Sequence, residues 1–414
     1  MCCLFFFRNK KGDPFVQKNA FYNDLSDTNK YIIKCCFFIF FVNGIYGMVF
    51  GSILPQLSDT YHLNDLVSGM LISSHQIGNL IAGFLAGIIP IYLGKKNSIL
   101  FLSSFVVVGF LLIITTGQPW LLLVAFFFTG LSRGSISNFN NKVVNDISNS
   151  SPAASNLLHS LFAVGALISP FLVIITTKIF GVNGWRVTGI IIIVLILISQ
   201  FMFSRMSIEE EKPGKEKATS KKNYEFFKNN YFLVTVVILF FYLCAEATIT
   251  GFIVKYFVDS NILTVLQAQI VSSVLWLAIL VGRLGCILFG HLFKKSHLLL
   301  LISVGTSVFY FFLLNVTSYS LVLFIIFGLG VSMGGIYPTA MTIAGSSIKQ
   351  YPMAMGWLLI LGGIGGIAMP TITGILSDRF GIFAGMAAII VAIVIMLIGV
   401  MAYVFIERNN RATV

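Results

Sequence analysis

Few ionisable side chains interrupt the long apolar stretches of this sequence, and they are Glu246, Arg133, Arg283, His75 and His159. A charged group inside an apolar membrane span costs about 2.5 to 3.5 kcal/mol on insertion scales, so each must face a cavity or a partner. Glu246 is the one carboxylate among them. Because a carboxylate in apolar surroundings can take up and release a proton near neutrality, we predict that Glu246 couples transport to protons.

His159 is the second candidate for proton coupling, since imidazole changes its charge near neutral pH. The alternative for His159, and the favoured one for His75, is a hydrogen bond to a neighbouring helix. Glu246 also has a structural alternative, a permanent ion pair with an arginine that serves assembly. For Arg283, which lies between glycines, we favour such a stabilising ion pair.

The segment 130–141 is unusually polar for an apolar run. Arg133, Asn138 and Asn141 share a broad helical face by their three- and four-residue spacing. Amide and guanidinium groups suit the hydroxyl groups of a sugar-like solute, so these residues are predicted to bind substrate. The alternative is that they hydrogen-bond neighbouring helices, as polar residues in membranes often do.

The composition places these residues in a membrane protein. Of 414 residues, 57% are hydrophobic and 10% are charged, whereas soluble proteins carry about 25% charged residues. A soluble enzyme is therefore excluded. Unbroken apolar runs such as 190–198 exclude a β-barrel, whose strands alternate apolar and polar residues. We predict an all-α protein with two six-helix bundles.

Twelve spans are predicted, at residues 31–54, 66–93, 99–116, 120–144, 154–177, 187–203, 232–254, 265–293, 298–314, 321–343, 353–376 and 382–405. The domains that follow are an N-terminal segment 1–30, a first bundle 31–204, a linker 205–228, a second bundle 229–406 and a tail 407–414.

The charge pattern indicates orientation. Most of the 27 basic residues lie in connections on the side of both termini, which the positive-inside rule places in the cytoplasm. The net charge of +12 therefore reflects topology, with no nucleic acid as partner. The six cysteines show no zinc spacing or disulfide framework, so we expect no metal and no cofactor. A monomer in the cell membrane is expected, with lipid, protons and a small solute as its partners.

The two halves of the chain repeat one another. Gly165 and Pro170 recur as Gly365 and Pro370, and the glycine and serine pattern of 130–136 recurs in 330–336. Repeated bundles of this kind hold substrate near the bilayer midplane, between the halves. Pro170, Gly365 and Pro370 are predicted to shape or move helix contacts, as is Arg283.

The number of residues that separates Gly165 from Gly365 also separates Tyr46 from Glu246, so the repeat aligns these two residues. Tyr46 lies one helical turn from Asn43. We therefore expect these three residues to face one another across the interface between the bundles. Asn43 and Tyr46 join the predicted substrate-binding residues.

With twelve spans, a charged central loop and the pattern Gly-x-x-x-x-x-x-Gly-Lys-Lys at 87–96, the sequence resembles the major facilitator superfamily over residues 31–405. Pro90 stands where that family usually carries Asp. The resemblance implies a transporter without enzymatic activity.

Within the superfamily, the chain is similar to the fucose, galactose and glucose permease branch of sugar and proton symporters. The similarity rests on Tyr242-x-x-x-Glu246, on 156–159 with His159, on Gly165-x-x-x-x-Pro170 and on 336–338. It implies that Tyr242, Glu246, His159 and the polar face of 130–141 line a central cavity.

We therefore expect secondary active transport, a proton-coupled symport of a small hydroxylated solute such as a neutral sugar. The first alternative is a proton-driven efflux antiporter of drugs or other amphipathic solutes. Ser169 before Pro170 departs from the antiporter pattern, which disfavours export. The second alternative is a membrane sensor or lipid-handling protein.

Overall fold

The computed structural model describes residue 22 and residues 25–149, 151–207, 224–345, 351 and 353–412. The predicted segment 1–30 and the linker 205–228 therefore lie largely outside the described residues. Within the described part the chain is all-helical. The long helices are α2 Asp27–Tyr61, α3 Asp65–Thr115, α4 Pro119–Ile147, α5 Pro152–Phe180, α6 Gly184–Ser204, α7 Asn230–Asp259, α8 Val265–Phe289, α9 Lys295–Leu313, α10 Tyr319–Gly334, α11 Ile336–Ile343, α13 Met353–Phe380 and α14 Ile382–Ala412.

Ten continuous helical runs among the described residues are long and apolar enough to cross a membrane. Two of them, Asp65–Thr115 and Ala154–Ser204, contain 51 residues each. Because one crossing takes about 20 residues, each of these long runs holds two spans. The predicted twelve-span, all-α architecture is confirmed.

The second and third spans meet inside α3 without a loop. The turn is made at Gly94, whose φ of 75° and ψ of 164° are not helical. A positive φ is accessible to glycine because it has no Cβ.

The tenth span, expected to be continuous, is instead divided at Gly335 into α10 and α11.

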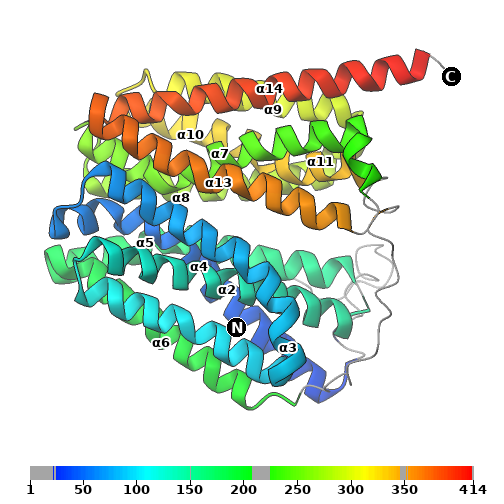
Figure 1. Ribbon diagram of the computed structural model, residues 1–414. Helices are drawn as coiled ribbons and strands as arrows, with labels where there is room; N and C mark the ends of the chain where they lie inside the picture. The colour runs from blue at the N-terminus through cyan, green and yellow to red at the C-terminus, as the bar shows by residue number, and fades with distance from the viewer. Residues whose placement is uncertain are drawn as a thin grey trace, which may run out of the picture.

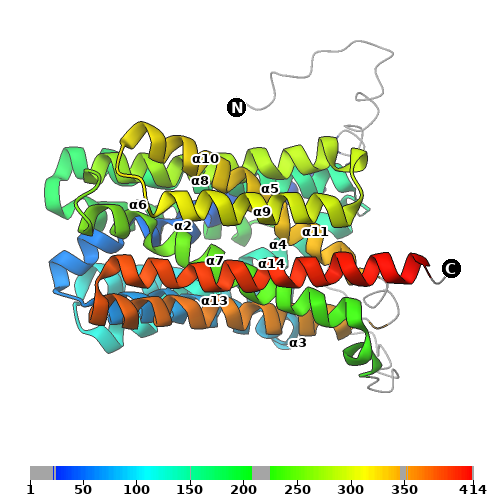
Figure 2. The ribbon, with the colours of Figure 1, turned by 90° about the horizontal axis from the view of Figure 1, so that it is seen from above.

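The helices run roughly along one direction, with α3, α4 and α6 on one side and α9, α13 and α14 on the other (Figure 1). The start of α7 and the end of α14 lie at the same end of the bundle in both views (Figures 1 and 2). We call this the terminal end. The opposite end, with the connections at 62–64, 260–264 and 381, is the loop end.

Buried apolar side chains form two clusters, one within 32–206 and one drawn mainly from 226–403. The repeat is visible in helix packing. A Cβ added at Gly134 would lie 2.5 Å from the carbonyl oxygen of Asn79, and one at Gly334 would lie 2.4 Å from that of Ile279. Gly134 and Gly334 are as far apart in the sequence as Asn79 and Ile279 are. Equivalent helices therefore approach equally closely in the two halves. Between the halves, α3 contacts α13, α5 contacts α8, and α2 contacts α7.

Candidate functional site

A cavity of about 620 Å³ lies between the two halves. Its walls come from α2, α3, α4 and α5 on one side and from α7, α8, α11 and α13 on the other. The lining extends toward the terminal end through Phe84 and Leu359, which are 53% and 43% exposed. None of the described loop-end connections lines it. The cavity therefore opens toward the terminal end, and its volume is typical of small-molecule sites.

Glu246 is the one carboxylate among the described residues that line the cavity. It lies mid-helix in α7, and its Oε1 is 2.9 Å from the hydroxyl oxygen of Tyr242, one turn away. Tyr242 is 1% exposed and does not line the cavity itself. Its hydroxyl also lies 3.2 Å from the carbonyl oxygen of Met333. Tyr242 thus acts from behind Glu246, as a hydrogen-bond donor that orients the carboxylate.

Two arginines line the same cavity, Arg133 from α4 and Arg283 from α8. Gly47 makes room for Arg133, because a Cβ there would lie 2.9 Å from its Nε. The guanidinium carbon of Arg133 is 5.8 Å from the centre of the Phe162 ring, within cation–π distance. Both side chains therefore reach the space between the bundles.

The ion pair predicted for Arg283 is not found. Among the described residues, no carboxylate forms a salt bridge with Arg283 or with Arg133. The Nε of Arg283 is buried without a hydrogen-bond partner. Arg283 faces the cavity instead of fastening two helices. Flanking glycines predict a close helix contact, but they do not indicate which side of the helix makes it.

Among the predicted amides of α4, Asn138 and its neighbour Ser137 line the cavity. Asn141 does not, and its Nδ2 donates to the carbonyl oxygen of Ser137, 2.9 Å away in the same helix. Helical spacing alone could not separate the two, because both fall on one broad face. Two cavity residues that sequence analysis missed, Gln76 and Asn79 of α3, add further amides.

Asn43 and Tyr46 of α2 are 1% and 0% exposed and do not line the cavity. The Nδ2 of Asn43 lies 3.5 Å from the carbonyl oxygen of Arg133, so it contacts the α4 backbone. The expected direct meeting of these two residues with Glu246 is not found. The repeat aligned the helices correctly, but side chains buried inside the first bundle cannot reach the interface.

His75 lines the cavity and is 4% exposed. Its Nδ1 is 3.0 Å from the Thr129 hydroxyl, which itself donates to the carbonyl oxygen of Phe126 at 2.7 Å. Because the threonine proton is already used, Nδ1 donates and Nε2 is the bare acceptor. This agrees with the helix-bridging role favoured for His75. His159 is exposed, lies outside the cavity lining and places its ring 5.5 Å from that of Phe40.

Two aromatic residues complete the cavity wall, Trp276 of α8 and Tyr337 of α11. Trp276 is 6% exposed, so it belongs to the wall and does not face lipid. Tyr337 stands in the motif at 336–338 that carried the resemblance, and this was the signal that could have placed it in the site.

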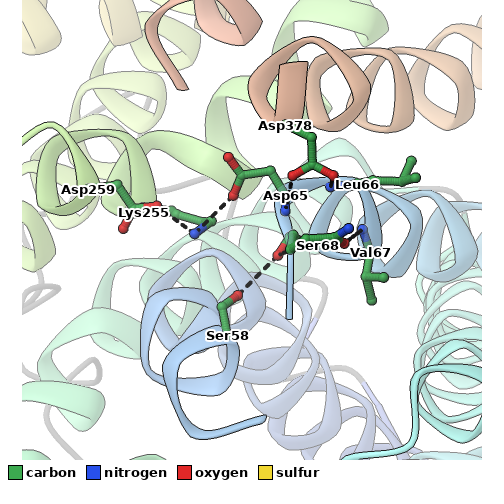
Figure 3. Close-up of polar contacts among 9 residues, drawn as sticks. Ser58, Asp65, Leu66, Val67, Ser68, Lys255, Asp259 and Asp378 are labelled. Atoms are coloured by element: carbon green, nitrogen blue, oxygen red, sulfur yellow. Dashed lines mark hydrogen bonds and ion pairs between the residues drawn. The ribbon is translucent and has the colours of Figure 1, made fainter. Parts of the chain in front are cut away.

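The loop end is held closed by a polar network that joins the two halves (Figure 3). Lys255 of α7 pairs with Asp65 at the start of α3, Nζ to Oδ1 3.1 Å, and with Asp259 of its own helix, Nζ to Oδ2 2.5 Å. Asp378 of α13 accepts hydrogen bonds from the backbone N–H groups of Asp65 at 2.7 Å and Leu66 at 3.1 Å. A carboxylate at a helix N-terminus is favourable because it satisfies unpaired donors.

Close backbone contacts reinforce this closure. Pro370 of α13 presents its carbonyl oxygen to Gly69 of α3, where a Cβ would lie 2.2 Å away. Gly365 acts within the second half, since its Cβ would lie 2.1 Å from the carbonyl oxygen of Phe240 in α7. Pro170 is buried inside α5. The halves therefore touch at the loop end and separate around the cavity toward the terminal end.

A polytopic helical bundle with two repeated halves and a cavity between them is the arrangement of a membrane transporter. The family model described as Major Facilitator Superfamily matches residues 36–351. The chain belongs to the major facilitator superfamily.

Two relatives are similar to this chain over most of its length. The chain is 22% identical over 391 residues to Bypass of stop codon protein 6 of Saccharomyces cerevisiae, covering 84% of this chain and 78% of that protein. It is 21% identical over 372 residues to the Protein TsgA homolog of Buchnera aphidicola, covering 87% and 92%.

Two solved structures are similar in fold. A mutant of the nucleoside transporter NupG superposes with a TM-score of 0.74 at 12% identity, covering 89% of this chain and 99% of that one. A bacterial homolog of the human lysosomal transporter Spinster, inward-facing and unoccupied, superposes with a TM-score of 0.72 at 13% identity, covering 92% and 98%.

Proposed function

We propose that this transporter is a proton-coupled symporter of a small hydroxylated solute that works by alternating access. The observation that carries the proposal is the cavity between the halves, with one carboxylate and a set of amides in its wall. Transporters with parallel repeats bind substrate at this position and expose it to each side in turn.

Glu246 is the proposed proton carrier. It lines the cavity, where solute and proton can meet, and Tyr242 holds one of its carboxylate oxygens at 2.9 Å. A group that is both accessible and oriented can exchange a proton with the side to which the cavity opens. His159 lies outside the cavity lining and packs against Phe40, so we assign it no primary role in proton coupling.

The proposed solute carries several hydroxyl groups. Asn79, Asn138, Gln76 and Ser137 all line the cavity and supply both donors and acceptors. This donor and acceptor mixture supports a sugar-like solute, the class that the similarity to the fucose, galactose and glucose permease branch implies. Nucleosides, for which one structurally similar transporter is named, also carry sugar hydroxyls and belong on the same panel of test solutes.

We infer that the termini face the cytoplasm and that the protein is a monomer in the cell membrane. Basic residues gather at the terminal end, namely Lys95, Lys96, Arg205, Lys228, Lys294, Lys295 and Arg408. This distribution supports the orientation by the positive-inside rule. With this orientation the cavity opens inward, and Lys255, Asp65 and Asp378 close the outer side.

The decisive experiment is Glu246→Gln in protein reconstituted into liposomes. The amide keeps the shape of the side chain but cannot carry a proton. We expect loss of accumulation driven by a pH gradient, with exchange of solute across the membrane retained. Asp146→Asn, which changes an exposed carboxylate of α4 outside the cavity lining, is the matched control and should keep proton-driven accumulation.

Unchanged uphill uptake by Glu246→Gln would contradict the proposal and move coupling to another group or ion. Saturable binding of hydrophobic cations in place of hydroxylated solutes, with competition by protons, would favour the efflux alternative.

A further inference from the structure

The positive and negative charges of the cavity lining do not cancel. Arg133 and Arg283 carry two positive charges, and among the described lining residues Glu246 alone carries a negative one. The sequence-based expectation of a neutral solute assumed that Glu246 offsets Arg133 and that Arg283 is used elsewhere. Because Arg283 also lines the cavity, an excess of one positive charge remains when Glu246 is ionised.

The two arginines stand on opposite walls. Arg133 comes from α4 of the first half and Arg283 from α8 of the second, and both are within electrostatic reach of Glu246 or of Tyr242, its hydrogen-bond donor. Neither arginine forms an ion pair within the described residues, and the Nε of Arg283 is buried without a partner. A buried donor without a partner is costly, so this geometry favours a ligand that supplies an acceptor.

A carboxylate is the ligand group that these side chains fit. The guanidinium group offers a planar fork of donors that matches the two oxygens of a carboxylate or the oxygens of a phosphate. A phosphate monoester carries about 1.5 to 2 negative charges at pH 7 and would exceed the charge available. A small polyol with one carboxylate carries one negative charge, which matches the excess of one positive charge in the cavity. Its hydroxyl groups remain free to hydrogen-bond Asn79 and Asn138.

We propose that the cavity binds a hydroxylated monocarboxylate between Arg133 and Arg283, and that this anion is loaded together with a proton on Glu246. The inference rests on the proposed symport and specifies its substrate class. Adding one anion and one proton leaves the net charge of the cavity unchanged. The loaded transporter then moves no more charge through the membrane than the empty one, so transport is electroneutral.

Proton and anion binding are linked through the groups around Glu246. Several charged or titratable groups lie within electrostatic reach of Glu246 or of the two arginines. They are Arg133 from α4, Arg283 from α8, Tyr337 from α11, Tyr242 from its own helix, Tyr46 from α2, His75 from α3 and, outside the cavity lining, His159 from α5. Neutralising Glu246 removes its competition for the arginines, so protonation strengthens anion binding. By reciprocity the anion strengthens protonation by the same factor.

The test uses purified full-length protein and two matched pairs of probes, D-gluconate against D-glucose and D-galacturonate against D-galactose. We expect the anions to raise the unfolding temperature and their neutral counterparts to leave it unchanged. Anion affinity should fall at least tenfold from pH 6 to pH 8 in wild type, and Glu246→Gln should keep the higher affinity at both pH values. Uptake by liposomes should not change when a potassium gradient with valinomycin sets the membrane potential.

Arg133→Gln and Arg283→Gln should each weaken anion binding at least tenfold. Arg379→Gln, which removes an exposed arginine outside the cavity, should not. Arg283→Lys should restore part of the affinity, because it keeps the charge but loses the planar fork. If the glutamine variants do not fold, the wild-type comparison of anions with neutral sugars and the dependence on membrane potential still decide the question.

If neutral sugars or nucleosides bind and the anions do not, this inference is overturned and the proposed symport remains intact. Binding of the anions with accumulation indifferent to the pH gradient would support the anion site and overturn the symport. Binding of hydrophobic cations alone would overturn both.

Discussion

At the scale of single residues, neighbouring amides on one helix have different surroundings. Asn138 is exposed to the cavity, whereas the Nδ2 of Asn141 is satisfied by the carbonyl oxygen of Ser137. Both had been predicted to bind the solute. Only a side chain that reaches the cavity can exchange its water contacts for contacts with the ligand, so the two residues differ in function although their spacing is alike.

We predict that Asn138→Ala weakens solute binding about tenfold, because one lost hydrogen-bond partner costs about 1 to 3 kcal/mol and about 1.4 kcal/mol is a factor of ten. Asn141→Ala is the matched control and should change affinity less than twofold. Solute-induced shifts of the unfolding temperature measure both. An equal loss in the two variants would show that the cavity wall has been assigned wrongly.

At the scale of elements, the helices of each half approach one another through glycines. Such contacts allow dispersion forces and backbone contacts to stabilise a bundle in lipid, where no hydrophobic driving force acts between helices. The contact between Gly365 of α13 and the carbonyl oxygen of Phe240 in α7 is among the tightest, with 2.1 Å left for a Cβ.

We expect Gly365→Ala to lower the free energy of unfolding by about 1 to 3 kcal/mol, the usual cost of forcing extra volume into a packed core. Gly285→Ala is the matched control, since a Cβ at Gly285 meets nothing within 4 Å. It should keep the stability or raise it by up to about 1 kcal/mol, because alanine is the better helix former. Thermal unfolding in detergent, followed by tryptophan fluorescence, compares the two. If they unfold alike, close packing at Gly365 does not stabilise the bundle.

At the scale of the whole molecule, one end of the interface between the halves is fastened and the other is open. The Lys255 side chain is 7% exposed and joins α7 to Asp65 of α3, while Asp378 satisfies the first N–H groups of α3. These contacts must break when the loop end opens. They therefore set part of the free-energy difference between the two states of the transporter.

We predict that Lys255→Met shifts the population toward a state with an open loop end, because Asp65 and Asp259 then face one another without the cation between them. A loss of about 1.4 kcal/mol would change the ratio of the states tenfold. Spin labels on Gln118→Cys and Thr317→Cys, exposed loop-end positions in opposite halves, report the separation as a distance distribution.

Lys178→Met removes an exposed lysine at the same end and serves as the control. Its distance distribution should match that of the parent protein. A Lys255→Met variant whose distribution is also unchanged would mean that packing alone, such as Gly69 against Pro370, keeps the loop end closed.

The architecture could be predicted from the sequence because its causes are local. Apolar runs of about 20 residues are read directly from the chain, and they specify twelve spans whatever their mutual arrangement. Glu246 could be singled out for the same reason, since a carboxylate in an apolar run is costly wherever the helix lies. The repeat indicated a central cavity, as Gly134 and Gly334 now illustrate.

Which side chains face that cavity was decided by the tertiary structure. The orientation of a helix about its own axis depends on its neighbours, and a sequence hydrophobic on nearly every face does not encode it. Tyr46 is therefore buried inside the first half, and Arg283 faces the cavity where an ion pair was expected. The bond between Lys255 and Asp65 joins residues far apart in the chain, so only the packed bundle brings these charges together.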